Sequence, residues 1–93
     1  MDPLFRFVWD ETARIRTHLM WMYTYYHCWN IYNPSIVYLR QHSWEFMRTN
    51  IDYVTQAWAN LNTLIESNDR PELRALLDSM EQYRPIWHTV KTF

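Results

Sequence analysis

Residues 44–65, which read WEFMRTNIDYVTQAWANLNTLI, decide the fold of this chain. Large apolar side chains recur along the segment and before it at alternating steps of three and four residues. The repeating positions are Val37, Trp44, Met47, Ile51, Val54, Trp58, Leu61 and Ile65, with Arg40 as the one charged interruption. This spacing places the apolar side chains on one stripe of an α-helix, and no alternating strand pattern competes with it. The segment therefore predicts one long amphipathic helix.

Two breaks bound this helix. Proline restricts the residue before it to extended backbone and suits the first position of a helix, so Asn33 before Pro34 predicts a new helix with Asn33 as its N-cap. At the other end, Asn68 can supply the left-handed residue that stops a helix. Asp69 and Glu72 then have the spacing of a capping box for the following helix. We expect the central helix to cover about residues 34–67.

The segments on both sides carry the same repeat. Asp2 followed by Pro3 predicts the start of a first helix over about residues 3–32. A third helix is expected over about 71–84. Pro85 removes one backbone hydrogen bond there, so we predict a kink or break near Tyr83 or Arg84 and a short helical tail over 86–92. The stripe of the first helix is Phe5, Val8, Thr12, Ile15, Leu19, Met22, Tyr26 and Trp29, and that of the third is Leu73, Leu76, Leu77, Met80, Tyr83 and Trp87.

Short connections between long helices make neighbouring helices antiparallel. We therefore predict an all-α, up-down-up three-helix bundle with a proline-kinked third helix, built as a single domain over residues 1–93. Its core should contain Leu19, Met22, Trp29, Ile51, Val54, Trp58, Leu73, Leu77 and Met80.

The composition excludes several function classes. The chain has no glycine, which removes glycine-rich phosphate and dinucleotide loops. The formal net charge is −1 and the arginines are dispersed, so no nucleic-acid partner is expected. The absence of glycine, six tryptophans and regular helix seams suggest a designed or engineered protein.

The cysteine content and the start of the chain suggest a location. Cys28 is the only cysteine, so the chain forms no internal disulfide, and we expect a reducing cytoplasm, including that of a recombinant host. The first residues lack a basic stretch followed by an apolar run, so we expect no signal peptide. No apolar run is long enough for a membrane span.

One segment without Asp, Glu, Lys or Arg, residues 17–39, is the predicted functional region. Large side chains point in every direction around its helix, whereas a three-helix bundle covers only part of each helix. We predict a partner-binding surface there, formed by Met20, Trp21, Tyr23, His27 and Tyr32. The expected partner is a second copy, giving a homodimer, or another helical protein. The competing interpretation is that the second helix and the tail after Pro85 cover the segment within the chain.

Catalytic and metal sites find little support in the sequence. No two of the four histidines lie at i,i+4 on one helix, so no metal site is predicted. Cys28 directly follows His27, and helical neighbours do not face each other, which argues against a Cys–His nucleophile and against an enzyme. No cofactor is expected. The alternative function is a bundle that holds a ligand or haem in an aromatic and Met-lined pocket, with His18 or His27 in contact.

Overall fold

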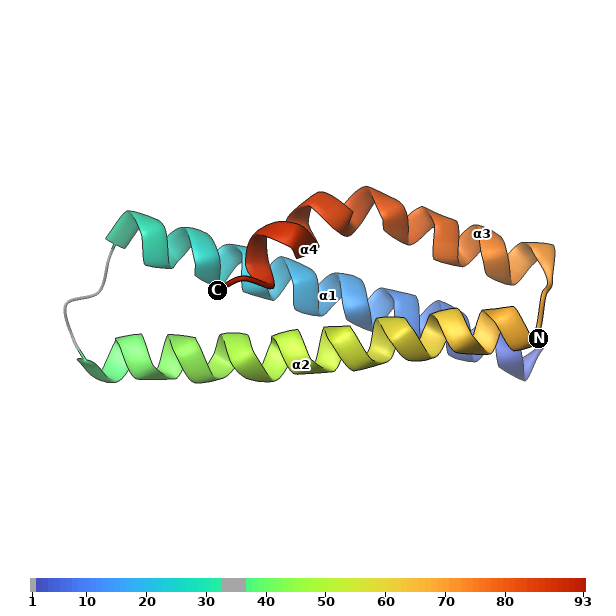
Figure 1. Cartoon of the computed structure of the whole chain (residues 1–93), viewed down its shortest axis with the longest axis horizontal. Coiled ribbons are helices and arrows are strands. Elements are labelled where there is room, and N and C mark those ends of the chain that lie inside the picture. Colours follow the sequence, from blue (N-terminus) through green and yellow to red (C-terminus); the bar gives the residue numbers. More distant parts are fainter. Residues whose placement is uncertain (1, 33–36) are drawn as a thin grey trace.

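The computed structural model describes the backbone of residues 2–32 and 37–93, and the side chains of 2–27 and 44–93. Its elements are α1 (Pro3–Tyr32), α2 (Val37–Ser67), α3 (Pro71–Ser79), the 3₁₀ turn η1 (Met80–Tyr83) and α4 (Arg84–Val90). No strand occurs in the described ranges. The predicted all-α three-helix bundle is confirmed, with η1 and α4 continuing the third helix (Figure 1). The predicted cap at Asn33 lies outside the described residues.

The helices run up, down and up along an elongated body (Figure 1). The principal extents are 49 × 21 × 19 Å. α1 contacts α2, α3, η1 and α4, and α2 also contacts α3. The C-terminal end of the chain lies beside α1 and α2, short of the C-terminal end of α1 and the N-terminal end of α2 (Figure 1). The last turns of α1 and the first turns of α2 therefore extend past the third helix, which α3, η1 and α4 form together.

The predicted stripes form the core. Its buried apolar residues are Val8, Ile15, Leu19, Met22, Met47, Ile51, Val54, Ala57, Trp58, Leu61, Ile65, Leu73, Met80, Trp87 and Val90. Burying one such large side chain stabilises the fold by about 1.5–3 kcal/mol. Trp44, which lies on the predicted stripe of α2 but is not among the residues expected in the core, is 55% exposed. Leu77 is only half-buried, and the side chain of Trp29 lies outside the described part.

The helix starts follow the predicted chemistry in one of two cases. Asp2 caps α1, since its Oδ1 accepts a hydrogen bond from the backbone N–H of Leu4 at 3.0 Å. The predicted capping role of Asp69 was wrong. Arg70 occupies the N-cap position of α3 without a side-chain capping bond, and Asp69 lies one residue too early and pairs with Arg74 at 2.9 Å.

The predicted break near Pro85 is present but begins earlier. α3 ends at Ser79, and the next four residues form the tighter turn η1. The proline ring clashes with the carbonyl four residues before it, so this turn cannot remain a regular α-helix. Pro85 then lies in the first turn of α4, where its missing N–H is not needed. The break directs α4 inward and buries Trp87 and Val90.

Candidate interaction surface

A second stripe runs along α1 beside the core stripe. From Phe7 to Tyr25 each of its positions lies one residue before a core position, so it points to the flank of the helix that faces α2. Its members keep the steps of three and four residues throughout: Leu4, Phe7, Glu11, Arg14, His18, Trp21 and Tyr25. Because α3 packs against the other flank of α1, residues of this second stripe can contact either α2 or a molecule outside the chain.

A stripe of residues on α2 lies opposite the second stripe of α1, and the two stripes make a series of contacts. The rings of Tyr25 and Phe46 stack with centroids 4.1 Å apart. One step further along, His18 Nδ1 and Asn50 Oδ1 form a hydrogen bond, and the Nδ2 group of Asn50 donates to a backbone carbonyl of α2 at 2.8 Å. The Tyr53 ring lies 4.3 Å from the His18 ring. These contacts close the flank of the hairpin along its middle.

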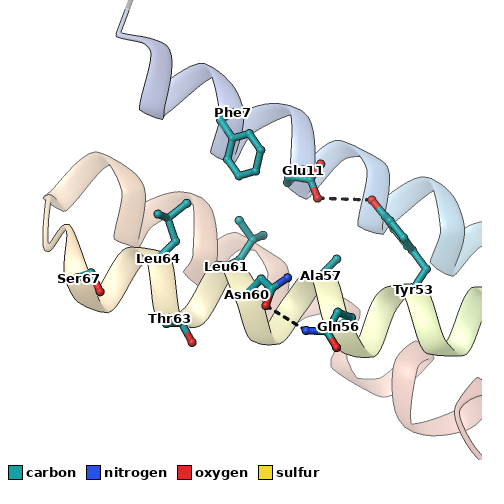
Figure 2. A pocket seen from close by; sticks show the side chains of 10 residues that line it. All are labelled: Phe7, Glu11, Tyr53, Gln56, Ala57, Asn60, Leu61, Thr63, Leu64 and Ser67. Carbon is teal, nitrogen blue, oxygen red and sulfur yellow. Dashed lines mark hydrogen bonds between the residues drawn. The ribbon is translucent and has the colours of Figure 1, made fainter.

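Toward the N-terminal end of α1, a groove lies between α1 and α2. The groove has a volume of about 590 Å³, and Figure 2 shows two of its lining residues on α1 and the others on α2. The lining residues are Phe7, Glu11, Tyr53, Gln56, Ala57, Asn60, Leu61, Thr63, Leu64 and Ser67.

Glu11 is the one lining residue that carries a formal charge at neutral pH. Its side chain is only 15% exposed, and it accepts a hydrogen bond from the Tyr53 hydroxyl at 3.5 Å (Figure 2). Burial, and then the charge of Glu11, raise the pKa of Tyr53. The cation that pairs with Glu11 is Arg14, at 3.1 Å, and its side chain is 68% exposed. The groove therefore contains a largely buried carboxylate, that of Glu11, which is paired with a mostly solvent-exposed guanidinium, that of Arg14.

The flank of α1 beyond the groove carries exposed aromatic surface. Phe7 and Trp21 are each 52% exposed and Tyr25 is 43% exposed. Trp21 also lies at 5.3 Å from the His18 ring, in an edge arrangement. Trp9 is equally exposed at 50%, but it stacks on Phe5 and lies away from this flank. We call the α1 residues of the second stripe, together with the groove, the uncovered face.

The predicted site residues do not all share one surface. Met20 is 45% exposed and lines a shallow depression together with Trp21. Tyr23 is half-buried and packs partly against the core, with the exposed His27 ring against it at 4.3 Å. The side chain of Tyr32 lies outside the described part. Of the four whose side chains are described, only Trp21 belongs to the uncovered face.

The histidines proposed for a ligand or haem do not converge. His18 and His27 are nine residues apart, which places them about 13 Å apart along α1 and on opposite sides of it. Nδ1 of His18 is bonded to Asn50, and neither histidine lines the groove. Within the described residues, no group of three or more His, Cys, Asp or Glu side chains is positioned to hold a metal ion. The side chain of Cys28 lies outside this part of the chain.

Comparison with known proteins gives no relative. No protein-family model, no curated protein and no solved structure matches the chain. In the part of the chain that the structure describes, no helix is both long and apolar enough to cross a membrane.

Proposed function

We propose that this chain is a non-enzymatic protein-interaction module that binds a helical partner along the uncovered face of α1 and α2. One observation carries the proposal: Phe7, Trp21 and Tyr25 are half-exposed on a single stripe of α1, next to a groove lined by α1 and α2 alone. Of the three, Phe7 lines the groove, and exposed aromatic side chains on one stripe are typical of binding hot spots.

The shape of the surface favours a helix as the occupant. The lining residues on α2 run from Tyr53 to Ser67, which is about 21 Å of helix and four turns. Two neighbouring helices of a bundle form such a groove on each side of their contact, and α3 occupies the other one. A helix with apolar side chains at steps of three and four residues fits this geometry.

The proposal is tested with the full chain and two matched variants. Trp21→Arg places a charge on the uncovered face, and Trp9→Arg places the same charge on the same helix at equal exposure but off that face. Helical peptides are selected against the wild type from a displayed amphipathic-helix library. We expect the selected peptides to lose at least tenfold in affinity for Trp21→Arg and to retain it for Trp9→Arg, with unchanged helicity by circular dichroism. Equal binding to both variants would contradict the proposal.

A ligand-holding bundle is the second candidate function, and the volume of the groove favours it. About 590 Å³ lies within the range of small-molecule sites, and the lining combines apolar side chains with a few polar ones. The ligand would contact Tyr53 and Glu11 in place of a histidine. Titration with a hydrophobic fluorescent dye tests it: binding to the wild type that is lost in Leu64→Arg supports the candidate, and no binding to the wild type contradicts it.

A further inference from the structure

We propose that the partner of the uncovered face is a second copy of this chain, docked with the two α1 helices antiparallel. This inference rests on the proposed function and specifies its partner. A two-fold axis passes between Glu11 and Arg14, so that Glu11 of each copy meets Arg14 of the other. A two-fold interface requires a surface that is complementary to itself. The second stripe of α1 meets that requirement by its order of residues.

The register follows from the position of the axis. With Glu11 opposite the partner's Arg14, the residue four positions earlier, Phe7, lies opposite the partner's His18. One further step brings Leu4 opposite the partner's Trp21. At both steps outside the charged pair an apolar or aromatic group therefore faces an aromatic group, and Tyr25 lies beyond the partner's Leu4, outside the paired stretch. Since Phe7 lines the groove, the second α1 helix lies across its mouth.

The charge distribution supports this register. Glu11 is largely desolvated at 15% exposure, while its cation within the chain is a 68% exposed arginine on the next turn. Because the Arg14 side chain is mostly in solvent, water screens its i,i+3 pair with Glu11, and this pair can be exchanged for one between copies. Docking moves Arg14 of each copy out of water and next to the partner's Glu11, whose carboxylate is already desolvated. Because of the two-fold symmetry, the dimer contains this pair twice. Charge-assisted hydrogen bonds to a carboxylate are stronger in such surroundings.

The area of the face fits a reversible dimer. The stretch from Leu4 to Trp21 is about 26 Å long at the helical rise per residue, and the body is 19–21 Å across. A contact that took in the full width of the body would cover about 500 Å² per copy, or about 1,000 Å² in total, so the interface lies at or below the lower limit for specific interfaces. We expect association that depends on concentration, with dimers in the upper micromolar range and above.

Charge reversal with mixing tests the register. Glu11→Arg places four arginines, two from each copy, at the axis of a dimer, and Arg14→Glu places four glutamates there, so each variant alone should be monomeric where the wild type is dimeric. Mixing the two variants restores attraction, because the side chains that face each other across the axis then carry opposite charges again. We expect sedimentation velocity to show at least a tenfold weaker self-association of each variant and a heterodimer at wild-type strength in the mixture. Circular dichroism checks that each variant is folded.

The contradicting results are distinct. A wild type that is monomeric up to millimolar concentration overturns the second copy as partner, while the peptide selection above still decides the proposed function. A wild-type dimer that is weakened by Trp21→Arg but not by either charge reversal overturns the register alone. Dimers weakened by neither Trp21→Arg nor charge reversal overturn the uncovered face as the interface. If either variant fails to fold, Glu11→Gln and Arg14→Gln replace the pair, and equal self-association of both with the wild type contradicts the proposal.

Discussion

Replacing Trp58 separates two opposing effects in the core. The side chain is 3% exposed and packs against Trp87 at 6.5 Å between ring centroids, with the Arg84 guanidinium 4.0 Å above the ring. Its Nε1–H is buried and has no hydrogen-bond partner among the described residues. Trp58→Phe leaves roughly 40 Å³ unfilled, and the cavity together with the lost burial of the removed atoms costs about 1–2 kcal/mol. It also removes an unsatisfied donor whose burial costs about 1–3 kcal/mol.

The two effects nearly cancel, so we expect Trp58→Phe to change the free energy of unfolding by less than about 1 kcal/mol. Trp58→Ala, by contrast, removes the whole ring and should cost about 3–5 kcal/mol. Urea denaturation followed by circular dichroism at 222 nm measures both, and the melting temperatures should differ by more than about 10 °C. A Phe variant that is destabilised as strongly as the Ala variant would refute the reasoning, because the indole N–H would then contribute to stability.

Three further predictions concern the helix starts and the α1–α2 contacts. Asp2→Ala should lower the melting temperature by a few degrees because it removes a capping bond, whereas Asp69→Ala should leave it nearly unchanged, and equal effects in thermal unfolding would contradict this. The hydrogen bond from Arg70 lowers the pKa of Asp2, so their pair stabilises the fold above the ordinary carboxyl pKa and loses that effect as the pH falls through the lowered one. Arg70→Gln should therefore be less stable than the wild type near neutral pH, with a difference that vanishes in strong acid; a difference independent of pH contradicts this. A double-mutant cycle of His18→Ala and Asn50→Ala should give a coupling energy of about 1 kcal/mol, and strict additivity in urea denaturation would show that the two side chains do not interact.

The fold was predictable because the strongest signal in the sequence is the 3-4 repeat. The bounds of α1 follow from Asp2 and from the length of its stripe, and the buried residues of α2 follow from its period. Trp44 keeps the period of its stripe but is exposed, so the period alone does not show which part of α2 the third helix covers. The reach of that helix depends on where the chain bends before Pro85, and spacing alone does not reveal it.

The candidate surface was harder to predict than the core. Attention to residues without charge pointed to Met20, Tyr23 and His27, but which stripe faces outward depends on the flank that α3 and α4 occupy. The second stripe of α1 contains Glu11 and Arg14, which made it resemble an ordinary solvated face. Its 3-4 repeat one position before the core stripe was the available signal, since two adjacent stripes on one helix indicate two contact faces. The groove joins residues of α1 and α2 that are far apart in the sequence, so the sequence alone does not reveal it.

The uncovered face, in our proposal, holds a second copy of the chain. Isotope-filtered NMR on a one-to-one mixture of labelled and unlabelled protein tests this most directly, because only contacts between copies give signals. We predict contacts from the Trp21 indole to the partner's Leu4 methyl groups and from the Phe7 ring to the partner's His18 ring, at concentrations where the mass is that of a dimer. Contacts that instead join the surface around Met20 and His27, with none from Trp21 to Leu4, would contradict the proposal.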